Sequence, residues 1–283
     1  LIKKSSSNSG DMKMKYEVNQ NDIYLWQNDF DLDETLDCGQ AFRWKRIESE
    51  YDVTYIGTFL NTNLKISKSG DKFIFHNTTE NDFLNIWVDY FDLNTDYSKI
   101  KDIFSADETL KKACEFAGGI RLLKQDSWES LCSFIISQNN NIPRIKGIIE
   151  RLCEHYGAFP TPYKLAAETV ESLKYLRSGF RAKYLIDAAE KVSSGLVNLE
   201  DIKKMDIQQA RNTLMTIKGV GPKVAECVLL FGMYRTEAFP IDVWIKRVMA
   251  KFYPEGLPEF AVSKVGIAQQ YLFHYIRLNN EIL

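Results

Sequence analysis

The chain has 283 residues, of which 45% are hydrophobic and 26% are charged, and its formal net charge is −2. This composition is typical of a globular protein with two or three domains, and no apolar run reaches the ~18 residues of a membrane-spanning helix, which argues against an integral membrane protein. Residues 1–100 carry 11 Lys and Arg against 17 Asp and Glu, whereas residues 101–283 carry 25 against 21, so a polyanionic partner is expected to bind the later part.

The first residues and the cysteines both predict an intracellular protein. Residues 1–15 contain no long apolar segment, so we expect a tail rather than a signal peptide. The cysteines are odd in number, scattered and without a CxxC pair, which indicates reduced thiols and argues against a zinc site or an iron–sulfur cluster. They are Cys38, Cys114, Cys132, Cys153 and Cys227.

Residues 16–104 are predicted to form an antiparallel β domain. The stretches YDVTYIGTFL, NLKISKSG and KFIFHN alternate apolar and polar residues, and turn-forming residues separate them. Alternation of this kind is typical of strands that bury one face of a sheet. A further strand is expected to begin in GQAFRWKRI.

Residues 105–283 are predicted to be helical. The segments DSWESLCSFIISQ, IPRIKGIIERLCEHYG and FRAKYLIDAAEKVSSG have helical apolar spacing, with capping residues, proline or glycine at their ends. Four similar segments follow, and the last is SKVGIAQQYLFHYIRL. The expected fold class is therefore α+β, with an antiparallel sheet followed by packed helical domains.

The stretch TLMTIKGVGPKVAECVLLFG predicts a helix, a tight turn and a second helix over about residues 208–231. Gly219 and Gly221 can bring the backbone close to a ligand, and the free N–H groups of a helix that starts at Pro222 can bind phosphate. A hairpin that only packs two helices together fits the same spacing equally well.

Lys223 and Cys227 are four residues apart, so they share one face of this second helix. Desolvating an ammonium beside an apolar stretch is costly, and a neutral amine in such a place is a good nucleophile. A solvated lysine at the rim is the commoner alternative. Asp242 precedes another amphipathic segment, where it can cap the helix or supply a carboxylate that stabilises a cation or accepts a proton.

These motifs together resemble a known family. LMTIKGVGPKVAEC with FPIDVW resembles the hairpin and aspartate of the helix–hairpin–helix DNA glycosylases. CGQAFRW, SFIISQNNNIPRIKGIIERLC, GFRAKYL and AQQYLF are similar to the 8-oxoguanine DNA glycosylases of the eukaryotic-like class. The resemblance implies a TBP-like N-terminal sheet and a C-terminal helix that packs back on the cleft. No cysteine follows Cys227, so the iron–sulfur cluster of endonuclease III-type relatives is not expected.

The resemblance implies a glycosylase that also cleaves the DNA strand. Lys223 would attack C1′ of the damaged nucleotide and form a Schiff base, and β-elimination would then break the strand. Asp242 would stabilise the cationic sugar. The implied partner is duplex DNA containing 8-oxoguanine, bound by a monomer inside the cell, in the cytoplasm, nucleoid or nucleus, and no cofactor is required.

The family also implies how the flipped base is recognised. The backbone carbonyl of Gly39 would accept N7–H of 8-oxoguanine, Cys227 and Phe273 would sandwich the base, and Gln269 would bind its Watson–Crick edge. Phe231 stands where relatives have a pocket methionine. Lys223 and Cys227 would form an ammonium–thiolate pair.

The remaining implied roles concern contacts with the duplex. The residues expected to plug the helix, wedge the stack, contact the opposite base or bind phosphate are Asn139, Arg144, Phe180, Arg181, Gly219, Gly221 and Val224. The carbonyls of Met215, Ile217 and Val220 could hold a sodium or potassium ion. Besides Phe231, three positions depart from the family pattern: Lys218 replaces proline, Phe180 replaces tyrosine and Trp244 replaces histidine.

Two other functions fit the same features. One is a glycosylase of the same fold that removes another damaged purine, such as an alkylated base. The other is a DNA-binding module without catalysis, which would use the hairpin alone and would not need Lys223. A panel of damaged substrates separates the first from the leading hypothesis, and replacement of Lys223 separates the second.

Overall fold

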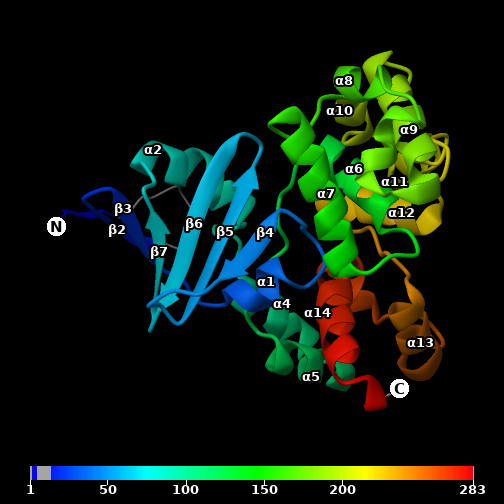
Figure 1. The fold of residues 1–283 in the computed structure, drawn as a ribbon. Helices are drawn as coiled ribbons and strands as arrows, with labels where there is room; N and C mark the ends of the chain where they lie inside the picture. Colours follow the sequence, from blue (N-terminus) through cyan, green and yellow to red (C-terminus); the bar gives the residue numbers. More distant parts are fainter. Residues whose placement is uncertain (1, 5–13, 283) are drawn as a thin grey trace. The chain divides into compact units, whose positions relative to one another are not determined.

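The computed structural model describes residues 2–4 and 14–282 of the chain (Figure 1). It divides into two compact units. The first comprises the chain up to Lys124 with Val248–Ala261 and the residues from Gln270 onward, and the second comprises Gln125–Arg247 and Val262–Gln269. The chain therefore leaves the first unit twice and returns to it twice.

The first unit contains an antiparallel sheet, whose strands within the described residues follow the order β1-β2-β3-β7-β6-β5-β4. The strands are β1 (Ile2–Lys4), β2 (Lys15–Asn19), β3 (Asp22–Trp26), β4 (Trp44–Ile47), β5 (Val53–Phe59), β6 (Thr62–Ser69) and β7 (Lys72–His76). The predicted alternation is present in β3, where Ile23 and Leu25 point into the core and pair with Phe75 and Phe73 of β7.

Aromatic side chains fill the core beneath this sheet. The Trp44 indole donates to the Tyr90 hydroxyl at 2.7 Å, and its ring lies against those of Trp87 and Phe91. Trp44 also lies opposite Gly57 of β5, where an added Cβ would come within 2.3 Å of the indole. The glycine thus makes room for a buried ring of large apolar area.

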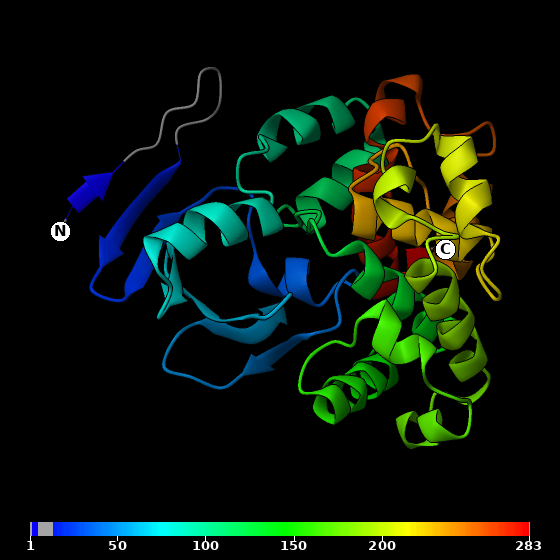
Figure 2. The same cartoon turned by 90° about the horizontal axis from the view of Figure 1, so that it is seen from above.

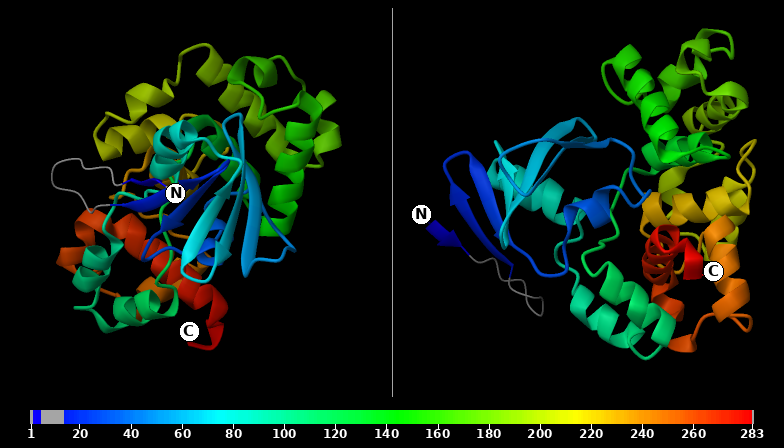
Figure 3. Two further views of the ribbon diagram at one scale, coloured as in Figure 1. Left: turned by 90° about the vertical axis from the view of Figure 1, so that its left-hand side faces the viewer. Right: turned by 60° about the horizontal axis from the view of Figure 1, so that its bottom comes forward.

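Helices complete the first unit. A helical segment from α2 (Glu80–Asp82) through η1 (Phe83–Trp87) to α3 (Val88–Tyr90) covers one face of the sheet (Figure 2). The other short helices are α1 (Leu32–Leu36), α4 (Tyr97–Phe104) and α5 (Glu108–Phe116), and α4 and α5 pack beside the later part of α14 (Val265–Leu278), as Figure 3 shows.

The α+β fold class predicted from the sequence is confirmed, since a sheet of antiparallel strands precedes a mostly helical region. The expected tail over residues 1–15 differs from the structure, because Ile2–Lys4 pairs with β2 and Lys15 already belongs to β2. The backbone pairing of β1 with β2 makes this segment a strand, and composition alone does not reveal such pairing. The rest of that tail, residues 1 and 5–13, lies outside the described residues.

The second unit consists of helices joined by loops, with no strand among its described residues. Its elements are α6 (Ser127–Ser137), α7 (Ile142–Tyr156), α8 (Pro162–Ala166), η2 (Ser172–Leu176), η3 (Gly179–Arg181), α9 (Ala182–Ser193), α10 (Leu199–Ile202), α11 (Ile207–Leu214), α12 (Pro222–Cys227) and η4 (Val228–Gly232). Three elements contribute residues to both units: α13 (Val243–Phe252), η5 (Glu259–Lys264) and α14. The last element, η6 (Asn280–Ile282), belongs to the first unit.

The apolar helix α6 packs against α7, α9, α12 and η4 of the second unit. Asp126 caps α6 by accepting the N–H of Glu129 at 2.8 Å, and Asn141 caps α7 in the same way from Arg144. Gly157 ends α7 with a φ of 72°, a left-handed conformation that favours glycine. In the part of the chain that the structure describes, no helix combines the length and apolarity needed to cross a membrane.

Candidate active site

Lys223 lies in the second unit, in the first turn of α12, where its side chain is half-buried. The turn before it is closed by the Val220 N–H, which donates to the Ile217 carbonyl at 3.1 Å. The Lys223 ammonium lies 5.6 Å from the centre of the Phe134 ring of α6, a favourable cation–π distance. The lysine is therefore held at the edge of the core rather than extended into solvent.

Cys227 lies one turn after Lys223 and is 2% exposed. Burial raises the pKa of the Cys227 thiol, and the neighbouring Lys223 ammonium lowers that pKa by less than burial raises it. This balance favours the neutral thiol, and the ammonium–thiolate pair expected from the resemblance stays a prediction. Low polarity around the sulfur outweighs the single nearby cation.

Asp242 precedes α13 and caps it, because one carboxylate oxygen accepts the N–H of Ile245 at 2.8 Å. The carboxylate also lies near Cys227, since its charge contributes to raising the pKa of that thiol. The hairpin lysine, the buried cysteine and the cap aspartate therefore share one neighbourhood in the second unit. The cap role and a chemical role for Asp242 are compatible, because only one of its two oxygens is used by this cap.

Two residues that the sequence analysis did not assign support this group. Phe134 stacks on Phe231 of η4, with ring centres 5.1 Å apart, and so contacts both Phe231 and Lys223. Glu226 of α12 is buried, forms an ion pair with Arg211 of α11 and accepts the N–H of Phe239 at 2.7 Å. Glu226 thereby ties both hairpin helices to the segment that leads to Asp242.

The two hairpin glycines, Gly219 and Gly221, differ in conformation and in surroundings. Gly219 has a φ of 80°, and an added Cβ would come within 2.3 Å of the Tyr184 ring of α9. Gly221 has a negative φ, and an added Cβ there would meet no other atom within 4 Å. Gly219 is thus required by packing, whereas Gly221 leaves open space over the start of α12.

Val224 was predicted as a contact for DNA, but its side chain is only 3% exposed. It packs into the core because α12 turns this face inward. The first bond of the helix runs from Ala225 N–H to the Gly221 carbonyl, so the Val224 N–H lies in the first turn, where N–H groups are left without partners inside the helix. Any contact from Val224 must therefore use its backbone.

Asn139 lies in the loop between α6 and α7 and is exposed, with a φ of 47°. Arg181 holds this loop: its guanidinium donates to the carbonyls of Gln138 and Asn139, the latter at 2.9 Å, and to that of Ser178 at 3.0 Å. Arg181 is 3% exposed. Most of its N–H donors are thus bound to carbonyl groups of the protein, and its contact with an opposite base stays a prediction.

The two other residues of this predicted interface are accessible. Arg144 is exposed at the start of α7, and its charge, together with burial, lowers the pKa of Arg181. Phe180 is 49% exposed and lies 4.5 Å from the Arg181 guanidinium. A loop asparagine, an arginine and an aromatic ring thus gather around one buried guanidinium.

Gly39 belongs to the first unit and has a φ of 88°. The next residue, Gln40, fixes this loop: its amide donates to the Thr35 and Arg121 carbonyls at 2.9 and 2.8 Å, and accepts the N–H of Leu123. All of these atoms are buried, so the network is rigid. The backbone around Gly39 is therefore fixed before any ligand binds.

The last two predicted base contacts lie on α14. Gln269 is buried and belongs to the second unit, whereas the half-buried Phe273 belongs to the first, where the Arg277 guanidinium lies 5.6 Å from its ring. Gly266 brings the start of α14 close to η4, since an added Cβ would come within 2.2 Å of Leu230. Close packing thus fixes the helix that carries Gln269.

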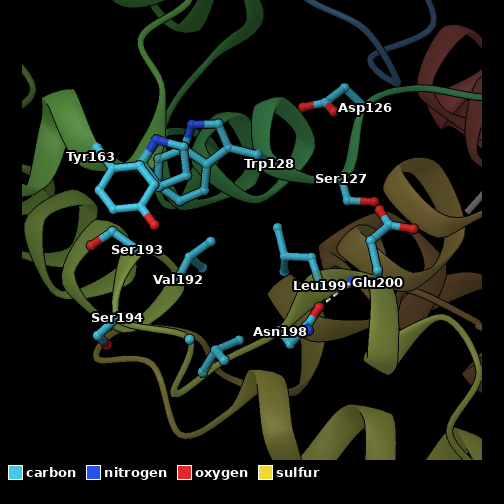
Figure 4. A pocket seen from close by; sticks show the side chains of 13 residues that line it. Asp126, Ser127, Trp128, Tyr163, Val192, Ser193, Ser194, Asn198, Leu199 and Glu200 are labelled. Carbon is cyan, nitrogen blue, oxygen red and sulfur yellow. Dashed lines mark hydrogen bonds between the residues drawn. The ribbon is translucent and has the colours of Figure 1, made fainter.

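An open pocket of about 490 Å³ in the second unit lies away from all these residues (Figure 4). It is lined by the starts of α6, α8 and α10 and by the end of α9, and the Asn198 side chain caps α10 at its base. None of the sequence-predicted site residues lines it. Across residues 2–4 and 14–282, no group of three His, Cys, Asp or Glu side chains is placed to hold a metal ion.

Comparison with known proteins identifies the family of the chain. Residues 22–131 match the model of the 8-oxoguanine DNA glycosylase N-terminal domain, and residues 132–256 match that of the HhH-GPD superfamily of base excision DNA repair proteins. The chain is 31% identical over 230 residues to a probable N-glycosylase/DNA lyase of Methanothermobacter thermautotrophicus, which covers 66% of this chain and 72% of the relative. The chain belongs to the 8-oxoguanine DNA glycosylase family.

Two further relatives extend the match. A solved Clostridium acetobutylicum 8-oxoguanine glycosylase/lyase, in complex with duplex DNA containing cytosine opposite 8-oxoguanine, is 38% identical with a TM-score of 0.85, covering 94% of this chain and 98% of that one. The N-glycosylase/DNA lyase of Saccharomyces cerevisiae is 37% identical over 158 residues, 48% of this chain and 42% of the yeast protein. The chain thus matches less than half the length of the yeast relative. The predicted enzyme class, a DNA N-glycosylase with lyase activity, is that of the family and is confirmed.

Proposed function

We propose that this member of the family excises 8-oxoguanine from duplex DNA and then cleaves the strand at the resulting site. The observation that carries the proposal is the position of Lys223 in the first turn of α12, beside buried Cys227 and near the Asp242 carboxylate. A nucleophilic amine and a carboxylate are the two groups that this reaction needs. The enzyme would act where chromosomal DNA is, inside the cell.

In the proposed mechanism the neutral amine of Lys223 attacks C1′ of the damaged nucleotide. A C–N bond to the lysine forms as the glycosidic bond breaks, and the base leaves with the bonding electrons and takes up a proton. The sugar passes through an oxocarbenium-like transition state, which the Asp242 carboxylate stabilises. Opening of the sugar ring gives a Schiff base, and loss of the C2′ proton expels the 3′ phosphate.

The proposed base contacts follow the positions of the predicted residues. The flipped base would lie between Cys227 and Phe273, with Gln269 at its Watson–Crick edge and Phe231 at the pocket wall. The Gly39 carbonyl would accept N7–H of 8-oxoguanine. Guanine has an acceptor at N7, so the same carbonyl would repel it. The fixed loop around Gly39 supports this discrimination, because a rigid acceptor cannot move away.

The proposed DNA contacts use the exposed loop and the hairpin. Asn139 would fill the space of the flipped base, Phe180 would wedge the stack, and Arg144 would reach the opposite base. The open space at Gly221 and the backbone N–H groups of Lys223 and Val224 would receive a phosphate. The carbonyls of Met215, Ile217 and Val220 would hold a sodium or potassium ion at the turn, although the Ile217 carbonyl already accepts the Val220 N–H.

Borohydride trapping tests this proposal. Native protein incubated with an 8-oxoguanine:cytosine duplex and borohydride should give a covalent adduct, and Lys223→Gln should give none while it still binds the duplex. Lys174→Gln is the matched control, because Lys174 is an exposed lysine of η2 in the same unit. Failure of the native protein to form an adduct, or an adduct that persists in Lys223→Gln, would refute the mechanism. A panel with alkylated purines checks the substrate class.

A further inference from the structure

Asp187 of α9 is buried, 7% exposed, directly against the hairpin turn. One of its carboxylate oxygens accepts the backbone N–H of Lys218 at 2.7 Å and the Lys191 ammonium at 2.8 Å. Lys191 in turn donates to the Thr216 carbonyl at 2.6 Å. The Asp187 and Lys191 side chains of α9 therefore bind the backbone at Lys218 and at Thr216, in the turn between α11 and α12.

The same face of α9 makes a third contact with this turn. Tyr184 precedes Asp187 by three residues, and its ring packs against Gly219 so closely that no side chain fits there. Residues three, four and seven apart lie on one side of a helix, so Tyr184, Asp187 and Lys191 form a continuous strip. This strip, which we call the α9 latch, contacts the turn from Thr216 to Gly219.

The latch carboxylate is ionised and paired. Burial by itself raises the pKa of Asp187, but the bonds from Lys191 and from the Lys218 N–H more than offset burial, and the pKa lies below its ordinary value. The Lys218 ammonium adds little, because it is 3.4 Å away and its side chain is 75% exposed. The bond that matters from residue 218 is that of its backbone N–H.

We infer that Asp187 and Lys191 are positioning residues that fix the hairpin turn, and through it the start of α12 that carries Lys223. The inference rests on the proposed function, in which this turn binds phosphate and Lys223 attacks the sugar. It also accounts for Lys218. The resemblance implies proline at this position, and proline fixes its own φ but has no N–H, whereas a buried carboxylate accepts the Lys218 N–H.

Substitutions at Asp187 test the latch directly. Asp187→Ala should weaken binding to a duplex with a non-cleavable abasic analogue about tenfold, as expected for loss of a charge-assisted hydrogen bond. It should slow Schiff-base trapping at saturating DNA and speed amide exchange of residues 216–223 well below the melting temperature. Asp187→Asn keeps an acceptor for the N–H and should recover most of the affinity. Glu190→Gln, which removes an exposed carboxylate from the same helix, should change none of these.

A double-substitution cycle separates the latch from a general loss of stability. Lys218→Pro alone should weaken duplex binding, because Asp187 loses its donor, but in the Asp187→Ala background it should be neutral or improve binding. An equal loss in both backgrounds, or native binding and exchange in Asp187→Ala, would overturn the inference. Should Asp187→Ala not fold, Lys191→Met gives the same readouts. Exchange and binding do not require base release, so they test the latch even where trapping of the native protein fails.

Discussion

At the scale of single residues, Asp242 shows how one side chain can serve folding and chemistry together. Its Oδ1 accepts the Ile245 N–H and so caps α13, a contact worth about 1 kcal/mol in comparable helices. An asparagine offers the same oxygen to the same N–H but carries no charge. The two roles can therefore be separated by an isosteric change.

We predict that Asp242→Asn folds and binds duplex DNA like the native protein but releases 8-oxoguanine at least about 100-fold more slowly. The reason is the loss of a carboxylate that stabilises positive charge in the transition state. Single-turnover release of the base measures the effect. Asp242→Ala should show the same chemical defect plus a lower melting temperature, and unchanged turnover in Asp242→Asn would remove this residue from catalysis.

The sequence could single out Lys223 and Asp242 as candidates because each has a local signature, a Gly/Pro turn before one and an amphipathic segment after the other. It could not show that Arg181 and Val224 are buried. Arg181 is buried against the Gln138 carbonyl, 43 residues away, and Val224 is buried because its side of α12 faces the core. Phe134 was missed for a similar reason, since an aromatic residue in an apolar helix has no distinguishing pattern.

At the scale of elements, the two glycines of the hairpin have different predicted roles. Gly219 is needed for packing, and Gly221 is predicted to leave room for a phosphate. Gly219→Ala would force a left-handed φ on alanine and drive its Cβ into the Tyr184 ring, so we predict a clear loss of stability, ~1 kcal/mol or more. Gly221→Ala meets no atom and should leave the melting temperature unchanged, but it should weaken duplex binding because the methyl group fills the phosphate space.

Thermal melting and binding to an abasic-analogue duplex distinguish the two glycine variants. The prediction requires opposite patterns, with stability lost in Gly219→Ala and affinity lost in Gly221→Ala. Native affinity in Gly221→Ala would show that no phosphate approaches this backbone. Gly195→Ala, at a loop with a φ of 77° and open space, controls for backbone strain without a clash.

The Arg181 guanidinium of η3 donates to the backbone of the loop that carries Asn139 and so holds that loop. Arg181→Lys keeps the charge, but a compact ammonium cannot reproduce the planar fork of N–H groups that donates to the Gln138, Asn139 and Ser178 carbonyls. We predict faster amide exchange over residues 137–141 and slower base release, with native salt dependence of duplex binding. Arg177→Lys, at an exposed position just before η3, should behave like the native protein. Unaltered exchange in Arg181→Lys would show that the Arg181 guanidinium does not hold this loop.

At the scale of the whole molecule, the division into units is less evident in the sequence than the fold class. Strand alternation and helical spacing predict the sheet and the helices, because both patterns are local. The helix α5 follows residue 105 and so falls in the predicted helical region, yet it belongs with the sheet, and the chain from Gln270 onward returns to that unit. Tyr271 shows why: its hydroxyl donates to the Ile120 carbonyl at 3.2 Å, a pairing that joins residues 151 positions apart.

The burial of His274 on α14 predicts that the stability of the first unit depends on pH. It is buried beside Phe116, its Nδ1 has no hydrogen-bond partner among the described residues, and burial, with the Arg277 charge, lowers its pKa from 6.5 to about 4. The neutral imidazole is therefore the folded form. Between pH 6.5 and 4 the unfolded chain binds a proton that the folded chain does not, so the contribution is present above pH 6.5 and is lost as the pH falls.

We predict that lowering the pH from 7 to 5 costs the native protein about 2 kcal/mol more free energy of unfolding than it costs His274→Gln. Urea denaturation at the two pH values measures the difference, and comparison with the variant removes the contributions of other groups. His155→Gln, at an exposed histidine, should keep the native pH dependence. Equal losses in the native protein and His274→Gln would mean that this imidazole is protonated inside the fold, and a partner for it would then have to exist near Asp37 or Asp31, the acidic groups whose charges act on it.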